Sequence, residues 1–212
     1  MKKTLALILV ILVASLGYFY FIKKEKAPAP SNTKTYRNST LGLSFIYPNM
    51  LTASTTGSSV VVHHEVPFEH PDYCDFRGDN AGTQKNLTDF NIAISLSDKD
   101  IVETIKQKSP YISPENFVNG KVVTSPGFID EVVIGNLSGY KIIEGVEGCG
   151  HTTYFFKISD NKTLVVVSDM ITIFTGAIPE ETASRAKAVP GIITSEEADQ
   201  ILKSIISTLK AR

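Results

Sequence analysis

The sequence predicts an α+β domain in which a mainly antiparallel β-sheet packs between or against helices. Short runs of alternating or β-branched residues fill the middle of the chain, and such runs are typical of strands. Helical periodicity occurs in only a few segments, and the clearest of them lies at the C-terminal end. Strands concentrated in the middle of a chain with few helices indicate a sheet covered by helices on at least one face.

The first predicted strand lies within residues 36–48. Leu43, Phe45 and Tyr47 recur at every second position, a glycine-containing turn precedes them, and Pro48 ends the run. We expect further strands in the runs 58–64, 89–96, 129–134, 140–146, 152–158 and 163–168. The last two runs flank the pair Asp160-Asn161, whose residue types tolerate positive φ, so we expect a β-hairpin there.

Three segments have the periodicity of helices. Residues 99–108 follow the capping candidate Asp98, and a weaker stretch at 180–188 begins after Pro179. The third begins at a capping box formed by Thr194 and Glu197. Its apolar stripe must lie against the sheet, and it consists of Ala198, Ile201, Leu202, Ile205, Ile206 and Leu209.

The N-terminal segment predicts a membrane anchor. Residues 4–22 are 19 residues without a charge, and lysines bracket them. As a helix they would span roughly 28 Å, close to the ~30 Å hydrocarbon thickness of a bilayer. We therefore predict a transmembrane anchor or uncleaved signal at 1–24, a Pro-rich linker at 25–35 and an extracytoplasmic domain at 36–212. The alternative is a cleaved signal peptide, because Val13-Ala14-Ser15 resembles a cleavage site.

The charge distribution argues against a nucleic-acid partner. The formal net charge is −1, but residues 1–26 carry five Lys and one Glu. The rest of the chain therefore holds 16 basic and 21 acidic residues. A net acidic domain repels the phosphate backbone of nucleic acids.

Cys74 and Cys149 are the only cysteines, and an even count in an exported domain favours a disulfide between them. Two unrelated reduced thiols are one alternative. Metal ligation by His70, Cys149 and His151 is a weaker one, because the Cys-Gly-His spacing places two ligand types on one face of a strand. We predict no metal and no cofactor.

The segment 65–87 lacks both the strand period and the helix period, yet it carries Phe68, Tyr73, Phe76 and Arg77. Long irregular loops in compact domains are often binding elements, so these four residues form a candidate binding loop. The alternative is a loop that Cys74 simply holds in place. No Gly-x-Ser-x-Gly elbow and no phosphate-binding Gly-rich loop occurs in the sequence, so we predict no catalytic residue.

Short motifs at both ends of the domain resemble those of the PsbP-like α/β/α sandwich family. They are Tyr36-Arg-Asn, the run from Gly42 to Pro48, and the terminal helix around residues 200–209. The chain is also similar to bacterial proteins that join such a domain to one N-terminal membrane anchor. The resemblance implies an antiparallel sheet between helices. It also implies binding or assembly more than catalysis, and it carries no functional residue over to this chain.

These observations together predict a membrane-anchored, extracytoplasmic, non-enzymatic binding or assembly module. The protein would lie in the cell membrane as a single-pass protein, with its globular domain on the extracytoplasmic side. Its partner would be a protein or a component of the cell envelope. Two alternatives remain open at this point: a hydrolase-type enzyme whose site is dispersed in sequence, and a His/Cys metal-binding domain. The sequence does not indicate a particular partner or an oligomeric state.

Overall fold

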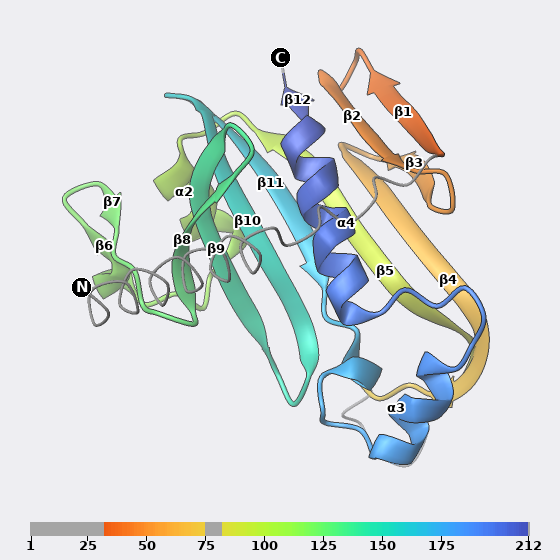
Figure 1. The fold of residues 1–212 in the computed structure, drawn as a ribbon. Coiled ribbons are helices and arrows are strands. Elements are labelled where there is room, and N and C mark those ends of the chain that lie inside the picture. Colours follow the sequence, from red (N-terminus) through yellow and green to blue (C-terminus); the bar gives the residue numbers. More distant parts are fainter. Residues whose placement is uncertain (1–31, 75–81, 212) are drawn as a thin grey trace, which may run out of the picture. The chain divides into compact units, whose positions relative to one another are not determined.

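A seven-stranded antiparallel sheet forms the centre of the domain (Figure 1). Its strands lie in the order β3-β4-β5-β11-β10-β9-β8, and every neighbouring pair is antiparallel. Their bounds are β3 Thr52–Thr56, β4 Ser59–Pro71, β5 Thr83–Ser97, β8 Ile129–Ile134, β9 Leu137–Val146, β10 Cys149–Ser159 and β11 Lys162–Asp169. The predicted mainly antiparallel sheet is confirmed.

The structure, a computed structural model, describes residues 32–74 and 82–211. The chain divides into two units, Met1–Asn32 and Thr33–Arg212. The predicted anchor at 1–24 lies outside the described residues, as do Phe76 and Arg77 of the candidate loop. Among the described residues, no helix has the length and hydropathy to cross a membrane.

Two smaller sheets accompany the central one. The three-stranded sheet consists of β1 (Thr33–Asn38), β2 (Leu43–Pro48) and β12 (Lys210–Ala211), with β2 in the middle. The two-stranded sheet consists of β6 (Phe117–Val118) and β7 (Lys121–Val122). Strand β1 begins three residues before the predicted start of the domain at Tyr36, so the end of the expected linker belongs to a strand.

The three described α-helices are α2 (Ile101–Lys108), α3 (Glu180–Lys187) and α4 (Ser195–Thr208). Two short 3-10 helices, η1 (Pro114–Asn116) and η2 (Thr172–Phe174), lie in the connections. The capping box of α4 is present as predicted. Helix α2 is capped by Asp100 and not by the expected Asp98. The Asp100 carboxylate accepts a hydrogen bond from the Glu103 N–H at 2.9 Å.

The central sheet lies between two apolar layers, because successive residues of its strands point to opposite faces. On one face, Tyr154 and Phe156 of β10 pack with Leu202, Ile205 and Ile206 of α4, which Figure 1 shows crossing in front of the sheet. On the other face, Phe155 of the same strand packs with Ile105 of α2. Full burial of each such side chain contributes about 1.5–3 kcal/mol, so these two layers hold the sandwich together.

Two details of the predicted strands need correction. We expected no regular structure in 65–87, but β4 continues to Pro71 and β5 starts at Thr83, which leaves only 72–82 as the connection. The hairpin of β10 and β11 is confirmed, yet neither Asp160 nor Asn161 has positive φ. The register of the two strands shifts between Lys157 and Ser159, and this irregularity accommodates a turn without a left-handed residue.

Candidate binding site

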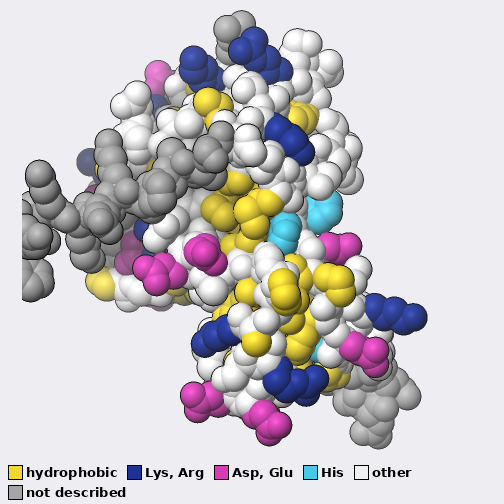
Figure 2. Space-filling model, turned by 45° about the vertical axis from the view of Figure 1, so that its right-hand side comes forward, with side chains coloured by type: hydrophobic (Ala, Val, Ile, Leu, Met, Phe, Trp, Pro, Cys, Tyr) yellow, Lys and Arg dark blue, Asp and Glu magenta, His cyan; other side chains and the backbone are white. Residues whose placement is uncertain are grey.

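The candidate site lies at the end of the sheet where β4 stops and β5 starts, beside α3. Val66 of β4, Leu87 of β5, Ile173 of η2 and Ala186 of α3 form a separate small core there. Their burial brings β4 and β5 together with η2 and α3, which lie much later in the chain. Figure 2 shows hydrophobic side chains gathered on the lower part of the molecule, where Figure 1 places α3, with acidic and basic side chains around them.

The predicted disulfide between Cys74 and Cys149 is present, with Cα atoms 5.7 Å apart. This distance is in the usual range for a disulfide. The Thr172 hydroxyl lies 3.1 Å from Sγ of Cys74 and 3.6 Å from Sγ of Cys149. The bond therefore attaches the connection after β4 to the start of β10, with η2 against it.

An aromatic row, which we define as Phe68, His70 and Tyr73, lies next to the disulfide. The ring centroids of Phe68 and His70 are 6.1 Å apart with a 28° interplanar angle. Those of His70 and Tyr73 are 5.5 Å apart with a 9° angle. The guanidinium carbon of Arg185, on α3, lies 5.9 Å from the centroid of the Phe68 ring. The row is thus a stack of three rings with a cation at one end.

The row borders an open pocket of about 230 Å³. Its lining combines polar and apolar side chains, and comprises His70, Asp72, Tyr73, Cys74, Gln84, Asn86, Leu87, Thr88, Met170, Ile171, Thr172 and Ile173. Oδ1 of Asp72 accepts a hydrogen bond from the Cys74 N–H at 3.0 Å, which orders the residues just before the disulfide. The pocket therefore offers ring edges, amides and one carboxylate to a ligand.

Tyr73 is half-buried, and burial raises the pKa of its phenol above the ordinary value, against the opposing positive charge of Arg185. The phenol thus stays protonated at neutral pH and can donate a hydrogen bond. The sequence placed Phe68 and Tyr73 in one loop, whereas the structure puts Phe68 on strand β4 and only Tyr73 in the connection.

The alternative metal ligands do not come together in the structure. Cys149 is bonded to Cys74 and has no thiolate to offer. Nδ1 of His70 lies 2.7 Å from the Pro71 carbonyl oxygen, and its Nε2 lies 3.3 Å from the Asn86 carbonyl oxygen. Nε2 of His151 lies 3.5 Å from the Glu144 carboxylate. No group of three or more His, Cys, Asp or Glu side chains within 32–74 and 82–211 could hold a metal ion.

One cluster brings together the residue types of a hydrolase. The Ser109 hydroxyl donates to Oε2 of Glu144 at 2.7 Å, and Nε2 of His151 lies 3.5 Å from the same oxygen. In a Ser-His-acid triad the histidine is the base of the serine, and the acid lies on the far side of the imidazole. Here the serine binds the acid directly and its side chain is buried, so the arrangement is that of a structural hydrogen bond.

Sequence reasoning missed Arg185 and several of the residues that line the pocket, Thr172 among them. A usable signal for the longer β4 was present, since Val66, Phe68 and His70 continue the strand period beyond His64. Pro67 obscured it, because proline within a run argues against a strand. Nothing in the local sequence could place Arg185 against Phe68, because only the packing of α3 on β4 does so.

Neither a family model nor a curated protein matches the chain. Among the solved structures that are similar to it are the following two. One is a crystal structure from Bacteroides thetaiotaomicron VPI-5482, with 12% sequence identity and a TM-score of 0.42. That match covers 87% of this chain and 49% of the other, so this chain spans about half the length of the Bacteroides chain.

The other is the solution structure of the cyanobacterial PsbP (CyanoP) from Synechocystis sp. PCC 6803. Its sequence identity is 11% and its TM-score is 0.36, and the match covers 89% of this chain and 98% of that one. A PsbP protein, of the family that the sequence motifs resemble, is thus among the solved structures similar to this chain. Similarities of this strength carry no argument about function.

Proposed function

We propose that the chain is a membrane-anchored extracytoplasmic module that binds a protein or a component of the cell envelope and has no catalytic role. The uncharged run at residues 4–22 supports the anchor. The disulfide between Cys74 and Cys149 supports an oxidising compartment for the domain, because such bonds persist outside the cytosol.

The observation that carries the binding role is the aromatic row with Arg185 at its end. Tyrosine and arginine are enriched among the residues that dominate binding energy at protein interfaces. The three rings are already stacked on one another, and the disulfide holds the backbone next to them. A partner would therefore have to order few of these side chains, which lowers the entropic cost of association.

The pocket beside the row supports binding over catalysis. Among the described residues that line it, no hydroxyl group is hydrogen-bonded to a histidine or a carboxylate. An activated nucleophile needs such a base within hydrogen-bond reach. The cluster of Ser109, Glu144 and His151 supports the alternative of an enzyme less well, because its serine is only 1% exposed.

Photo-crosslinking in the membranes of the native host tests the binding role. The full chain carries benzoylphenylalanine in place of Tyr73, and a matched chain carries it in place of Tyr111, a tyrosine that is 88% exposed on a segment outside this site. We expect a discrete crosslinked product from position 73 alone, which is lost when Arg185→Ala is added. Equal products from both positions, or none from position 73, would refute the site.

Fractionation tests the anchor separately. The chain should stay in the membrane pellet after an alkaline wash, because an apolar helix is held by burial and not by charge. A soluble mature form beginning near Leu16 would show instead that the N-terminal segment is a cleaved signal peptide.

A further inference from the structure

A second depression lies at the other end of the domain, and it differs in chemistry from the candidate binding site. It is a groove of about 620 Å³, within the size range of small-molecule sites. We define this basic groove by its lining, which comprises Arg37, Asn38, Ser39, Thr40, Leu41, Gly42, Leu43, Ser44, Ser58, Leu96, Asp98, Lys162 and Lys210. Figure 2 shows Lys and Arg side chains at the upper end of the molecule, where Figure 1 places β12 and the β1–β2 turn.

Three residues of the groove form one row across the three-stranded sheet. Arg37 of β1 and Lys210 of β12 are both directly opposite Ser44 of β2. Residues directly opposite each other in a sheet point to the same face. Neighbouring strands are about 4.8 Å apart, so the backbones of Arg37 and Lys210 are roughly 10 Å apart, with Ser44 between them. Leu43 and Phe45 point to the opposite face and into the core.

The charges of Arg37 and Lys210 are available to a ligand. Arg37 and Lys210 are exposed, and neither forms an ion pair with another residue of the described chain. The lining holds three basic side chains, Arg37, Lys162 and Lys210, against the single carboxylate of Asp98. This local excess of positive charge contrasts with residues 27–212 as a whole, which carry 16 basic and 21 acidic residues.

The wall of the groove is ordered before any ligand arrives. Oδ1 of Asn38 accepts a hydrogen bond from the Leu41 N–H at 3.0 Å, and its amide donates to the Tyr36 and Thr55 hydroxyls, each at 3.2 Å. These bonds fix the turn between β1 and β2. Gly42 ends that turn at φ 65°, a conformation that glycine adopts without strain.

We infer that the basic groove binds a small anion that carries a phosphate group. The Arg37 guanidinium can bind a phosphate with two parallel hydrogen bonds, and the Lys210 ammonium adds a point charge. The Ser44 hydroxyl between them can donate a third bond. A phosphate ester and the headgroup of an acidic phospholipid share this chemistry, and the groove has room for either. This site is independent of the aromatic row and of its partner.

Calorimetry on the full chain in a neutral detergent tests the inference, with pyrophosphate as the probe. A double variant with Arg37→Gln and Lys210→Gln removes both cations from the row. The matched control pair Lys85→Gln and Lys121→Gln removes the same charge from exposed positions outside the groove. We expect the first pair to weaken pyrophosphate binding by about tenfold or more and the control pair by less than about twofold. Rising salt should also weaken binding to the unmodified chain.

A second titration with short-chain phosphatidic acid separates the two sources of phosphate. If this lipid binds about tenfold more tightly than pyrophosphate, and the groove variant abolishes the difference, the site takes a lipid headgroup. If the two probes bind alike, it takes a free phosphate ester. Unchanged melting temperatures would show that the variants fold. The inference fails if neither probe binds, or if the control pair weakens binding as much as the groove pair does.

Discussion

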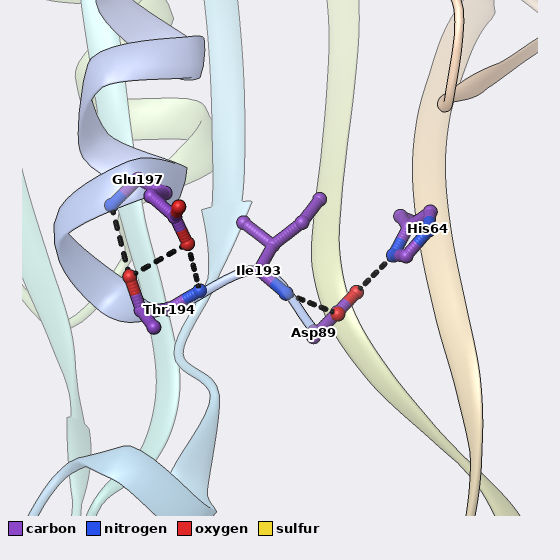
Figure 3. A network of polar contacts seen from close by, with 5 residues as sticks. All are labelled: His64, Asp89, Ile193, Thr194 and Glu197. Carbon is purple, nitrogen blue, oxygen red and sulfur yellow. Dashed lines mark hydrogen bonds and ion pairs between the residues drawn. The ribbon is translucent and has the colours of Figure 1, made fainter. Parts of the chain in front are cut away.

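Nδ1 of His64 lies 2.7 Å from Oδ1 of Asp89, a carboxylate that is completely buried (Figure 3). The second oxygen, Oδ2, accepts a hydrogen bond from the Ile193 N–H at 2.7 Å. Ile193 precedes Thr194, whose side chain caps helix α4 together with Glu197. One carboxylate thus joins β4, β5 and the start of the helix that covers the sheet.

The substitution His64→Ala should destabilise the domain by about 3 kcal/mol, because it leaves one oxygen of a buried carboxylate without a partner. The neighbouring His63→Ala is the matched control, since His63 is also half-buried on β4 but its side chain has no polar contact within the described chain. Urea denaturation of both variants measures the difference. A loss of the same size in both would show that the contact with Asp89 contributes little.

Loss of the disulfide should destabilise the domain by about 4 kcal/mol on the chain-entropy model, because it closes a loop with a sequence separation of 75 residues. For a domain of this size the melting temperature should fall by about 8–16 °C when Cys74 and Cys149 are both replaced by serine. Thermal unfolding of the variant, and of the native chain with and without reductant, tests this. Reductant should leave the variant unaffected. An equal melting temperature for reduced and oxidised protein would contradict the prediction.

Gly139→Ala should destabilise the domain by about 1–3 kcal/mol or more, because a methyl group at this position would meet the carbonyl oxygen of Phe155 on the neighbouring strand. Gly82→Ala is the control, since a methyl group there has no atom within 4 Å. Chemical denaturation of the two variants should separate them clearly. A stable Gly139→Ala protein would mean that β9 and β10 can move apart at this point.

Stability at alkaline pH should depend on Tyr154. Burial raises the pKa of its phenol from 10.0 to about 12, and the negative charge of Asp199 adds to the shift. Because the folded pKa lies above the unfolded one, the stabilisation is complete below pH 10 and is lost as the pH rises towards about 12. A shift of this size corresponds to about 2–3 kcal/mol.

Tyr154→Phe should therefore lose less stability than the native chain over this pH range. Tyr111→Phe, which removes an exposed phenol, should behave like the native chain. Urea midpoints recorded across the range measure the effect, and the ultraviolet absorbance of phenolate follows the ionisation directly. Parallel curves for all three proteins would show that Tyr154 ionises as an exposed tyrosine does.

The sequence by itself determined the elements whose signals are local. Thr194 and Glu197 lie within one turn of each other, so their capping box and the apolar stripe behind it could be recognised without knowledge of the fold. The strand period identified the middle of the sheet for the same reason. The cysteines could be paired because only two occur. The anchor, the cellular location and the binding role remain predictions.

Only the tertiary structure decided which distant residues meet. Asp89 contacts residues 25 and 104 positions away, and a carboxylate in an alternating run gives no sign that it will be buried and paired. In the same way, Arg185 reaches Phe68, and Arg37 shares a row with Lys210, because strand order and helix packing bring them together. Periodicity and capping act over a few residues, whereas these contacts depend on the burial of the whole apolar surface at once, and no local pattern encodes that.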